Sequence, residues 1–330
     1  MNVHKQGIDS VRRSMSIGAA IAVTGAAALM GASGESAALA PARVEAGATD
    51  TPNRFIDVDG VLFAYRQLGP ASGIPLVLFP HFRGTMDWWD PLLLDGLARQ
   101  RPVIIFDNRG VGLSQGETPD NAVAMARDAA AFIRALKLDR VDLFGFSIGG
   151  FVAQQLLLQD PGLVRKAVLA GTGTRGGDGM QERRPEVAKA AIQPDSFAGR
   201  LFLFFTPSDA SQQAGRRFLE RTRLRTRGVD PEASAQTIAA HGAMSAEWGR
   251  TEGRQEHLKR IAAVSTPVLV VNGVHDIMVP TVNSYLLAQA FPNAKLILYP
   301  DAGHGAIFQY PQECCRDVSA FLDGGTEQPG

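Results

Sequence analysis

The chain has 330 residues, 45% of them hydrophobic, and its 33 Lys and Arg residues are balanced by 33 Asp and Glu residues. A chain of this length and apolar content can bury the core of one large α/β domain. The neutral balance gives no electrostatic reason to expect a nucleic-acid partner, which would call for a basic face.

Residues 1–42 differ in composition from the rest of the chain and resemble an export signal. Lys5 and the paired Arg12 and Arg13 precede an Ala- and Gly-rich stretch over 17–32. This pattern predicts export, to the periplasm or the medium, through a twin-arginine-like signal. The alternative is a disordered extension of a cytoplasmic protein, since chains rich in Ala, Gly and Ser also fail to fold. The stretch is too short and too rich in glycine for a permanent membrane span.

A β-hairpin is predicted at the start of the folded part, and strands then alternate with helices. The turn dipeptide Asp59-Gly60 separates the segments 54–59 and 61–68. Short, continuously apolar segments follow, as expected of parallel strands buried on both faces. These segments are 75–79, 103–106, 141–146, 166–169, 268–271 and 295–298. The sequence therefore predicts an α/β fold with a mostly parallel sheet.

The clearest helix between these strands is expected over 120–138, where apolar residues recur at helical spacing and Asp120 can cap the start. The alternation of strands and helices stops between 175 and 261. A segment of this length is far beyond an ordinary connection, so we predict a helical cap there. The core then comprises 54–174 and 262–324. The cap's run of arginines, 216–227, is interpreted as a solvated face rather than as an attractor for an anionic substrate.

The segment after the strand 141–146 is the most informative of the chain. Gly145-Phe146-Ser147-Ile148-Gly149 places a serine between a strand and a helix, with a glycine two residues to either side. A nucleophilic serine needs such a strained turn, which lifts its hydroxyl above the sheet edge and leaves no room for neighbouring side chains. Ser147 is therefore the predicted nucleophile.

A serine hydroxyl also needs a general base, and the chain has six histidines. His304 lies in a glycine-flanked loop directly after the strand 295–298. Asp276 follows the strand 268–271 and would hold the imidazole by its other nitrogen. Ser147, Asp276 and His304 thus all follow parallel strands at their carboxyl ends, where open α/β sheets place their sites.

With these residues, the chain from 54 to 323 resembles the α/β-hydrolase fold family, in its serine esterase, lactonase and cofactor-free haloperoxidase-like branch. The segment 107–114 is similar to the family's D-x-R-G-x-G-x-S turn, the segment 80–84 stands where the family keeps its oxyanion loop, and 272–280 is similar to its acid loop. The resemblance implies an eight-stranded sheet flanked by helices, with the cap inserted after the sixth strand.

The resemblance also implies the roles of several other residues. The backbone amides of Ile148 and Phe82 would form the oxyanion hole, with Arg83 as the alternative to Phe82. Asp107 and Arg109 are expected to brace the glycine-rich turn as an arginine–carboxylate pair.

Large side chains near the serine are expected to line the substrate pocket and to favour an apolar acyl group, although they could equally pack the cap onto the core. They are His81, Trp88, Trp89, Phe146, Phe205 and Trp248. His81 is interpreted as a structural loop residue rather than as a second base.

The predicted activity is cleavage of a carboxylic ester or lactone, a small molecule, through an acyl-enzyme. Perhydrolysis is one alternative, because Gly145-Phe146-Ser147 resembles the elbow of the cofactor-free haloperoxidases. A hydrolase-fold receptor that keeps the triad to hold a ligand is another. No cofactor or metal is expected, since the sequence has neither G-K-[ST] nor H-E-x-x-H. The adjacent Cys314 and Cys315 predict no disulfide. Nothing in the sequence indicates the oligomeric state.

Overall fold

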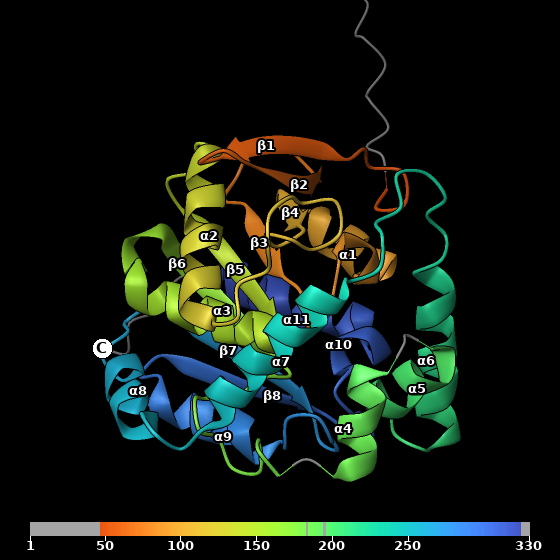
Figure 1. The fold of residues 1–330 in the computed structure, drawn as a ribbon, viewed down its shortest axis with the longest axis vertical. Coiled ribbons are helices and arrows are strands. Elements are labelled where there is room, and N and C mark those ends of the chain that lie inside the picture. Colours follow the sequence, from red (N-terminus) through yellow and green to blue (C-terminus); the bar gives the residue numbers. More distant parts are fainter. Residues whose placement is uncertain (1–46, 183, 194–195, 325–330) are drawn as a thin grey trace, which may run out of the picture. The chain divides into compact units, whose positions relative to one another are not determined.

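The computed structural model describes residues 47–182, 184–193 and 196–324 (Figure 1). The leader predicted over residues 1–42 lies outside these described residues. The strands are β1 (Arg54–Val58), β2 (Val61–Leu68), β3 (Leu76–Phe79), β4 (Val103–Phe106), β5 (Val141–Phe146), β6 (Val164–Ala170), β7 (Val268–Gly273) and β8 (Ala294–Tyr299). The α-helices are α1 (Pro91–Ala98), α2 (Ala122–Ala135), α3 (Ile148–Gln159), α4 (Pro185–Ile192), α5 (Phe197–Phe204), α6 (Asp209–Arg221), α7 (Ala235–Gly249), α8 (Arg254–Ile261), α9 (Val282–Ala290), α10 (Ala306–Gln309) and α11 (Pro311–Asp323).

The strands form one eight-stranded sheet in the order β1-β2-β4-β3-β5-β6-β7-β8. β1 and β2 pair antiparallel, as do β2 and β4, and every pair from β4 to β8 is parallel. Asp59 and Gly60 both have positive φ angles, of 52° and 81°, as a tight hairpin turn requires. The predicted hairpin and the mostly parallel eight-stranded sheet are confirmed.

The central strands are buried on both faces because helices cover each side of the sheet. Successive side chains of a strand point to opposite faces, so Leu143 of β5 joins the cluster beneath α2 and α3. Its neighbour Phe144 joins the cluster beneath α1 and α11. Both side chains are fully buried, and burial of such a side chain contributes about 1.5–3 kcal/mol. This double burial explains why the strands are continuous apolar runs in the sequence.

The start of α2 differs from the prediction. The N-cap is Asn121, whose side chain accepts a hydrogen bond from the Ala124 amide, and not Asp120. Asn121 has the extended backbone of an N-cap, with φ −146° and ψ 150°. Its side-chain oxygen therefore reaches the free amide of the first turn, whereas Asp120 lies one residue too far out.

Helices α4 to α8 occupy the segment between β6 and β7 that we predicted to be a cap. Figure 1 shows α4, α5 and α6 grouped together, with α7 and α8 apart from them. α7 and α8 contact α3, the helix that follows the serine, and α6 contacts α10. The cap boundary at 175–261 remains a proposal, supported by this placement between two neighbouring strands.

Two further features bear on the sequence predictions. Cys314 is buried and Cys315 half-buried, and both are free thiols in the described part of the chain. Within that same part, no helix combines the length and the hydropathy needed to cross a bilayer.

Candidate active site

Ser147 lies at a strained turn between β5 and α3. Its φ of 57° and ψ of −120° are unusual for a residue with a side chain. The chain is so crowded here that a Cβ on Gly149 would lie 2.2 Å from the Phe79 carbonyl oxygen. A Cβ on Gly145 would lie 2.6 Å from the carbonyl oxygen of Gly149. The two glycines are therefore a steric requirement of the turn that presents the Ser147 hydroxyl.

His304 and Asp276 form a buried, hydrogen-bonded pair. The imidazole Nδ1 donates to Asp276 Oδ2 at 2.8 Å, and the other carboxylate oxygen accepts the amides of Met278 at 2.7 Å and Val279 at 2.9 Å. Because an ionised carboxylate only accepts, the pair places the proton on Nδ1 and leaves Nε2 as an acceptor. The arrangement gives His304 the tautomer that a general base requires.

Ser147 and His304 line the same cavity. Within the described residues no hydrogen bond joins Ser147 Oγ to the imidazole, and such bonds commonly tighten only when substrate binds. The imidazole is fixed by its surroundings: the rings of Phe146 and Phe204 lie 5.0 Å and 5.5 Å from its centroid. A Cβ on Gly171 would lie 3.3 Å from it. Packing therefore holds the ring, and the hydroxyl is the part free to rotate.

The backbone amides of the predicted oxyanion loop differ in whether they already donate a hydrogen bond within the protein. The Arg83 amide donates to His241 Nδ1 at 3.1 Å, and burial lowers the pKa of His241 to about 4, which keeps this imidazole neutral and able to accept. Arg83, the alternative considered from the sequence, therefore has no free amide to offer. In the described part of the chain the amides of Phe82 and Ile148 donate to no protein acceptor, so these two remain for an oxyanion.

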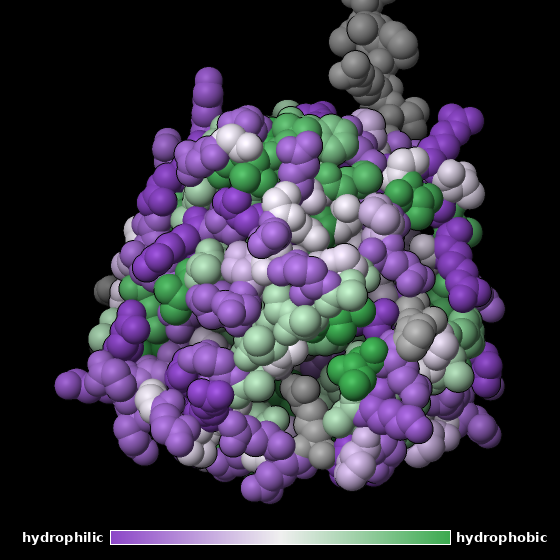
Figure 2. All heavy atoms as spheres, in the orientation of Figure 1, coloured by the Kyte–Doolittle hydropathy of each residue, from purple (hydrophilic) through white to green (hydrophobic). Residues whose placement is uncertain are grey.

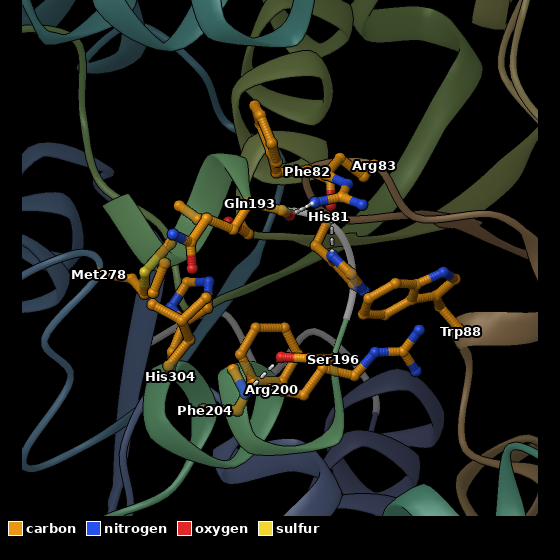
Figure 3. Close-up of a pocket in the computed structure, with 15 residues that line it drawn as sticks. His81, Phe82, Arg83, Trp88, Gln193, Ser196, Arg200, Phe204, Met278 and His304 are labelled. Carbon is orange, nitrogen blue, oxygen red and sulfur yellow. Dashed lines mark hydrogen bonds between the residues drawn. The ribbon is translucent and has the colours of Figure 1, made fainter. Parts of the chain in front are cut away.

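Two cavities meet at Ser147. The smaller, of about 70 Å³, contains His304 in its wall (Figure 3). The larger, of about 680 Å³, lies between α4 and α7, and Figure 2 shows the surface hollowed there, with apolar residues around the hollow. Phe82, Met278 and Ala191 line both cavities. The serine thus lies where a substrate can extend in two directions.

Four of the six predicted pocket residues divide into three groups. His81 and Trp88 line the smaller cavity. Phe146 is fully buried and contacts the rings of His81 and His304 from behind. Phe205 lines a different cavity, which does not include Ser147.

The assignment of Trp89 and Trp248 to the pocket is wrong. Trp89 is buried against Phe144 and Phe308. Trp248 stacks on Phe151 at 4.8 Å and donates its indole N–H to the Gly173 carbonyl. Both indoles fill core space beneath helices, because the burial of a large apolar surface outweighs exposure in a cavity.

The structure also shows pocket residues that the predicted set lacked. Phe204, and not Phe205, faces the smaller cavity, because the helix ends at Phe204 and the extended backbone of Phe205 turns its ring toward Phe218. Arg83, expected only for its amide, lines the cavity with its side chain, as does Arg200. The aromatic-rich stretch 202–205 was a signal for Phe204, but nothing in the sequence indicated the two arginines.

Asp107 and Arg109 do not pair with each other. Asp107 is fully buried and accepts the amides of Met86 and Leu113, each at 2.9 Å. Arg109 forms a bidentate pair with Asp128, with both distances 2.8 Å. The glycine-rich turn is therefore braced from two sides, and the predicted mutual pair is wrong because Asp107 points inward and Arg109 outward.

His81 is held as a neutral ring. Its Nδ1 donates to the Phe82 carbonyl at 2.8 Å, and its ring lies 4.7 Å from that of Trp88 and 5.3 Å from that of Phe204. Burial lowers the pKa of His81 to about 3. A ring so difficult to protonate fits a structural loop residue better than a second base.

The stability of the protein is expected to fall in mild acid, in part through His257 of α8. This imidazole bonds to Gln154 of α3 at 3.1 Å, and burial lowers its pKa to about 4. The unfolded chain binds the proton near pH 6.5. Stabilisation is therefore full above pH 6.5 and lost as the pH falls toward 4. Between pH 5 and 6, His257→Gln should reduce the slope of unfolding free energy against pH by about 1.2 kcal/mol per unit. Urea denaturation measures it, and an unchanged slope would contradict the protonation assigned to His257.

No group of three or more His, Cys, Asp or Glu side chains within the described residues is arranged to hold a metal ion. The polar groups that converge at the cavity are a hydroxyl, an imidazole–carboxylate pair and two free amides. Such a set can transfer an acyl group through a covalent intermediate on the hydroxyl oxygen.

Comparisons with known proteins identify the fold family. Residues 74–311 match the family model described as alpha/beta hydrolase fold. The solved structure of an alpha/beta hydrolase fold protein from Chitinophaga pinensis is 40% identical, with a TM-score of 0.79, over 85% of this chain and 100% of that one. A Rhizobium rhizogenes protein named as a candidate carbamate hydrolase, RutD, is 28% identical over 76% of this chain and 94% of its own. A non-heme chloroperoxidase of Streptomyces lividans is 28% identical over 80% of this chain and 97% of its own.

Proposed function

We propose, since this chain belongs to the alpha/beta hydrolase fold family, that it is a serine hydrolase that cleaves a carboxylic ester or a lactone. The observation that carries the proposal is the buried His304–Asp276 hydrogen bond of 2.8 Å in the wall of the cavity that Ser147 also lines. A hydroxyl, a base and an orienting carboxylate in chain order Ser, Asp, His are the parts that this chemistry requires.

The reaction proceeds in two halves. Ser147 Oγ attacks the carbonyl carbon while His304 Nε2 takes the hydroxyl proton, and Asp276 stabilises the imidazolium that forms. The amides of Phe82 and Ile148 donate to the oxyanion. His304 then returns the proton to the departing alkoxide, which leaves an acyl group on Ser147. Water, deprotonated by the same imidazole, attacks this acyl group and releases the acid.

The sizes of the two cavities support a substrate with a short acyl group on one side of the scissile bond and a larger leaving group on the other. The smaller cavity holds only a few non-hydrogen atoms, so it suits a short acyl group. The larger cavity opens between α4 and α7 and suits a leaving group of any moderate size. Met278 lies in the wall of both cavities, and so beside the proposed boundary between acyl group and leaving group.

The proposal is tested by a burst-phase assay with p-nitrophenyl acetate and p-nitrophenyl butyrate. Formation of an acyl-enzyme should release one equivalent of nitrophenol per protein before steady turnover. A fluorophosphonate should label Ser147, as peptide mass spectrometry can locate, and should abolish the burst. A protein that gives neither burst nor label would not be a serine hydrolase. Carbamates and lactones belong in the following substrate screen.

A second candidate function is perhydrolysis, which the similarity to a non-heme chloroperoxidase favours. Here hydrogen peroxide replaces water as the acceptor of the acyl group, so that the acyl-enzyme yields a peracid and free Ser147. We expect peracid from acetate and hydrogen peroxide if this activity exists. If added hydrogen peroxide yields no peracid and leaves the rate of ester hydrolysis unchanged, hydrolysis remains the proposed function.

A further inference from the structure

The smaller cavity contains a buried positive charge that has no anionic partner among the described residues. Arg83 is only 8% exposed, and its side chain lines this cavity together with Ser147. One guanidinium nitrogen, Nη1, donates to the Gln193 carbonyl at 2.6 Å, whereas Nε is buried and forms no hydrogen bond. Arginine stays charged, and a buried charge without a counter-charge is costly. The cavity therefore holds a cation that a ligand could neutralise.

The other buried arginines show what the chain does when an arginine is structural. Among the described residues, Arg66 and Arg101 are the remaining arginines with comparable burial. Arg66 pairs with Asp87 at 2.6 Å, and Arg101 pairs with Asp323 at 2.8 Å. Arg83 forms no such pair with any described residue. Among the described residues, Arg83 is therefore the buried arginine whose charge a ligand could pair.

The loop fixes where the Arg83 side chain begins. Its backbone has a φ of 64°, unusual for a residue with a side chain. The amide of Arg83 is bonded to His241, and the next residue, Gly84, closes a turn onto the His81 carbonyl at 2.8 Å. The same turn presents the Phe82 amide, so the guanidinium and the oxyanion donor share one rigid loop. A group bound by Arg83 is thereby placed at a set distance from the scissile carbonyl.

The walls of the cavity favour a negative charge. No acidic side chain among the described residues lines it, whereas the buried Arg83 does. Arg200 also lines the cavity and stacks its guanidinium on the Trp88 ring at 3.2 Å. Figure 3 shows Arg83 and His81 on one side of the cavity and His304 on the other. His81 Nε2 is buried without a partner but is an acceptor, because Nδ1 carries the ring proton. Arg83 is therefore the group at this end of the cavity that can bind an anion.

We propose that the smaller cavity is a subsite for a short acyl group that ends in a carboxylate, and that Arg83 binds this carboxylate. The substrate class is the half-ester of a small dicarboxylic acid of about four carbons. This inference rests on the proposed function, because it needs an acyl group on Ser147. It replaces the purely apolar acyl group expected from the sequence, since the sequence did not show the buried guanidinium.

Two isosteric esters test the subsite. Monoethyl succinate carries a carboxylate where ethyl levulinate carries a neutral methyl ketone of the same shape. The wild type should show a kcat/KM for monoethyl succinate at least about tenfold above that for ethyl levulinate. Arg83→Met should lower this ratio by about 10- to 100-fold, the range of a charge-assisted hydrogen bond. Arg83→Lys retains the charge but not the planar guanidinium, which can bind a carboxylate with two hydrogen bonds. It should therefore lower the ratio less than Arg83→Met does.

The assembly of each variant is monitored by fluorophosphonate labelling of Ser147, which needs no carboxylate. Free succinate should also inhibit the wild type competitively, and more strongly than the uncharged hexane-2,5-dione, so the wild type alone provides a test if a variant fails to fold. Equal kcat/KM for the two esters in the wild type, or a ratio unchanged in a labelled Arg83→Met, would overturn the carboxylate subsite and leave the hydrolase intact. No cleavage of either ester together with no labelling would instead overturn the proposed function.

Discussion

Replacement of Ser147 by alanine is expected to lower kcat for p-nitrophenyl butyrate by about 10⁵- to 10⁶-fold, because nucleophile and base act as a unit. Without the oxygen there is no covalent intermediate, and only the oxyanion donors and substrate binding remain to help water attack. Steady-state rates of purified protein, with the burst amplitude as a second readout, measure the effect.

The fold should survive this substitution. Alanine has the same Cβ as serine, so it adopts the φ of 57° at the same cost. The backbone bond from the residue 147 amide to the Ala170 carbonyl, 2.9 Å, does not involve the side chain. Ser245→Ala is a matched control, since Ser245 lines the larger cavity without contacting the pair of base and acid. It should change the rate less than about tenfold. A Ser147→Ala protein that kept more than a tenth of the activity would disprove the nucleophile.

The sheet could be predicted from the sequence because its strands are local signals. A strand buried on both faces is a short apolar run whatever lies above it, and β4 and β5 begin and end at the predicted residues. Ser147, Asp276 and His304 could be proposed as site residues for the same reason. Each follows such a run directly, and the parallel topology then brings the ends of β5, β7 and β8 to one edge.

The walls of the cavity could not be predicted, because they depend on contacts between distant segments. The Arg83 amide is bonded to a histidine 158 positions away in the sequence. This one contact favours Phe82 over Arg83 as the proposed oxyanion donor. From the sequence, Trp248 could lie in the core or in the pocket. Its stacking on Phe151 places it in the core. Phe204 and Phe205 are neighbours at the end of α5, and their side chains point in different directions. Even within a helix, successive side chains differ in direction by about 100°.

Replacement of Asp276 by asparagine is expected to lower kcat by about 10⁴-fold with little change in fold. The asparagine oxygen can still accept the amides of Met278 and Val279, which hold the loop at 2.7 Å and 2.9 Å. The side-chain NH₂ then faces His304 Nδ1, which must accept instead of donate. The proton moves to Nε2, so the imidazole presents a donor to Ser147 and is no longer a base. Nitrogen-15 spectra of the His304 ring should show the exchanged tautomer.

Asp301→Asn is the control that distinguishes the change of the His304 tautomer from a general loss of negative charge near the base. Asp301 lies on the same loop as His304 but accepts the hydroxyls of Thr206 and Ser208, at 2.7 Å and 2.6 Å, and not the imidazole. Its amide replacement should therefore change kcat less than about tenfold, because the tautomer of His304 is untouched. If both substitutions reduced the rate equally, the local negative charge would be the cause. If Asp276→Asn cost less than tenfold, another group would orient the base. If only Asp276→Asn lowers kcat strongly, and the tautomer of His304 is exchanged, then the base depends on the hydrogen bond between Asp276 and His304.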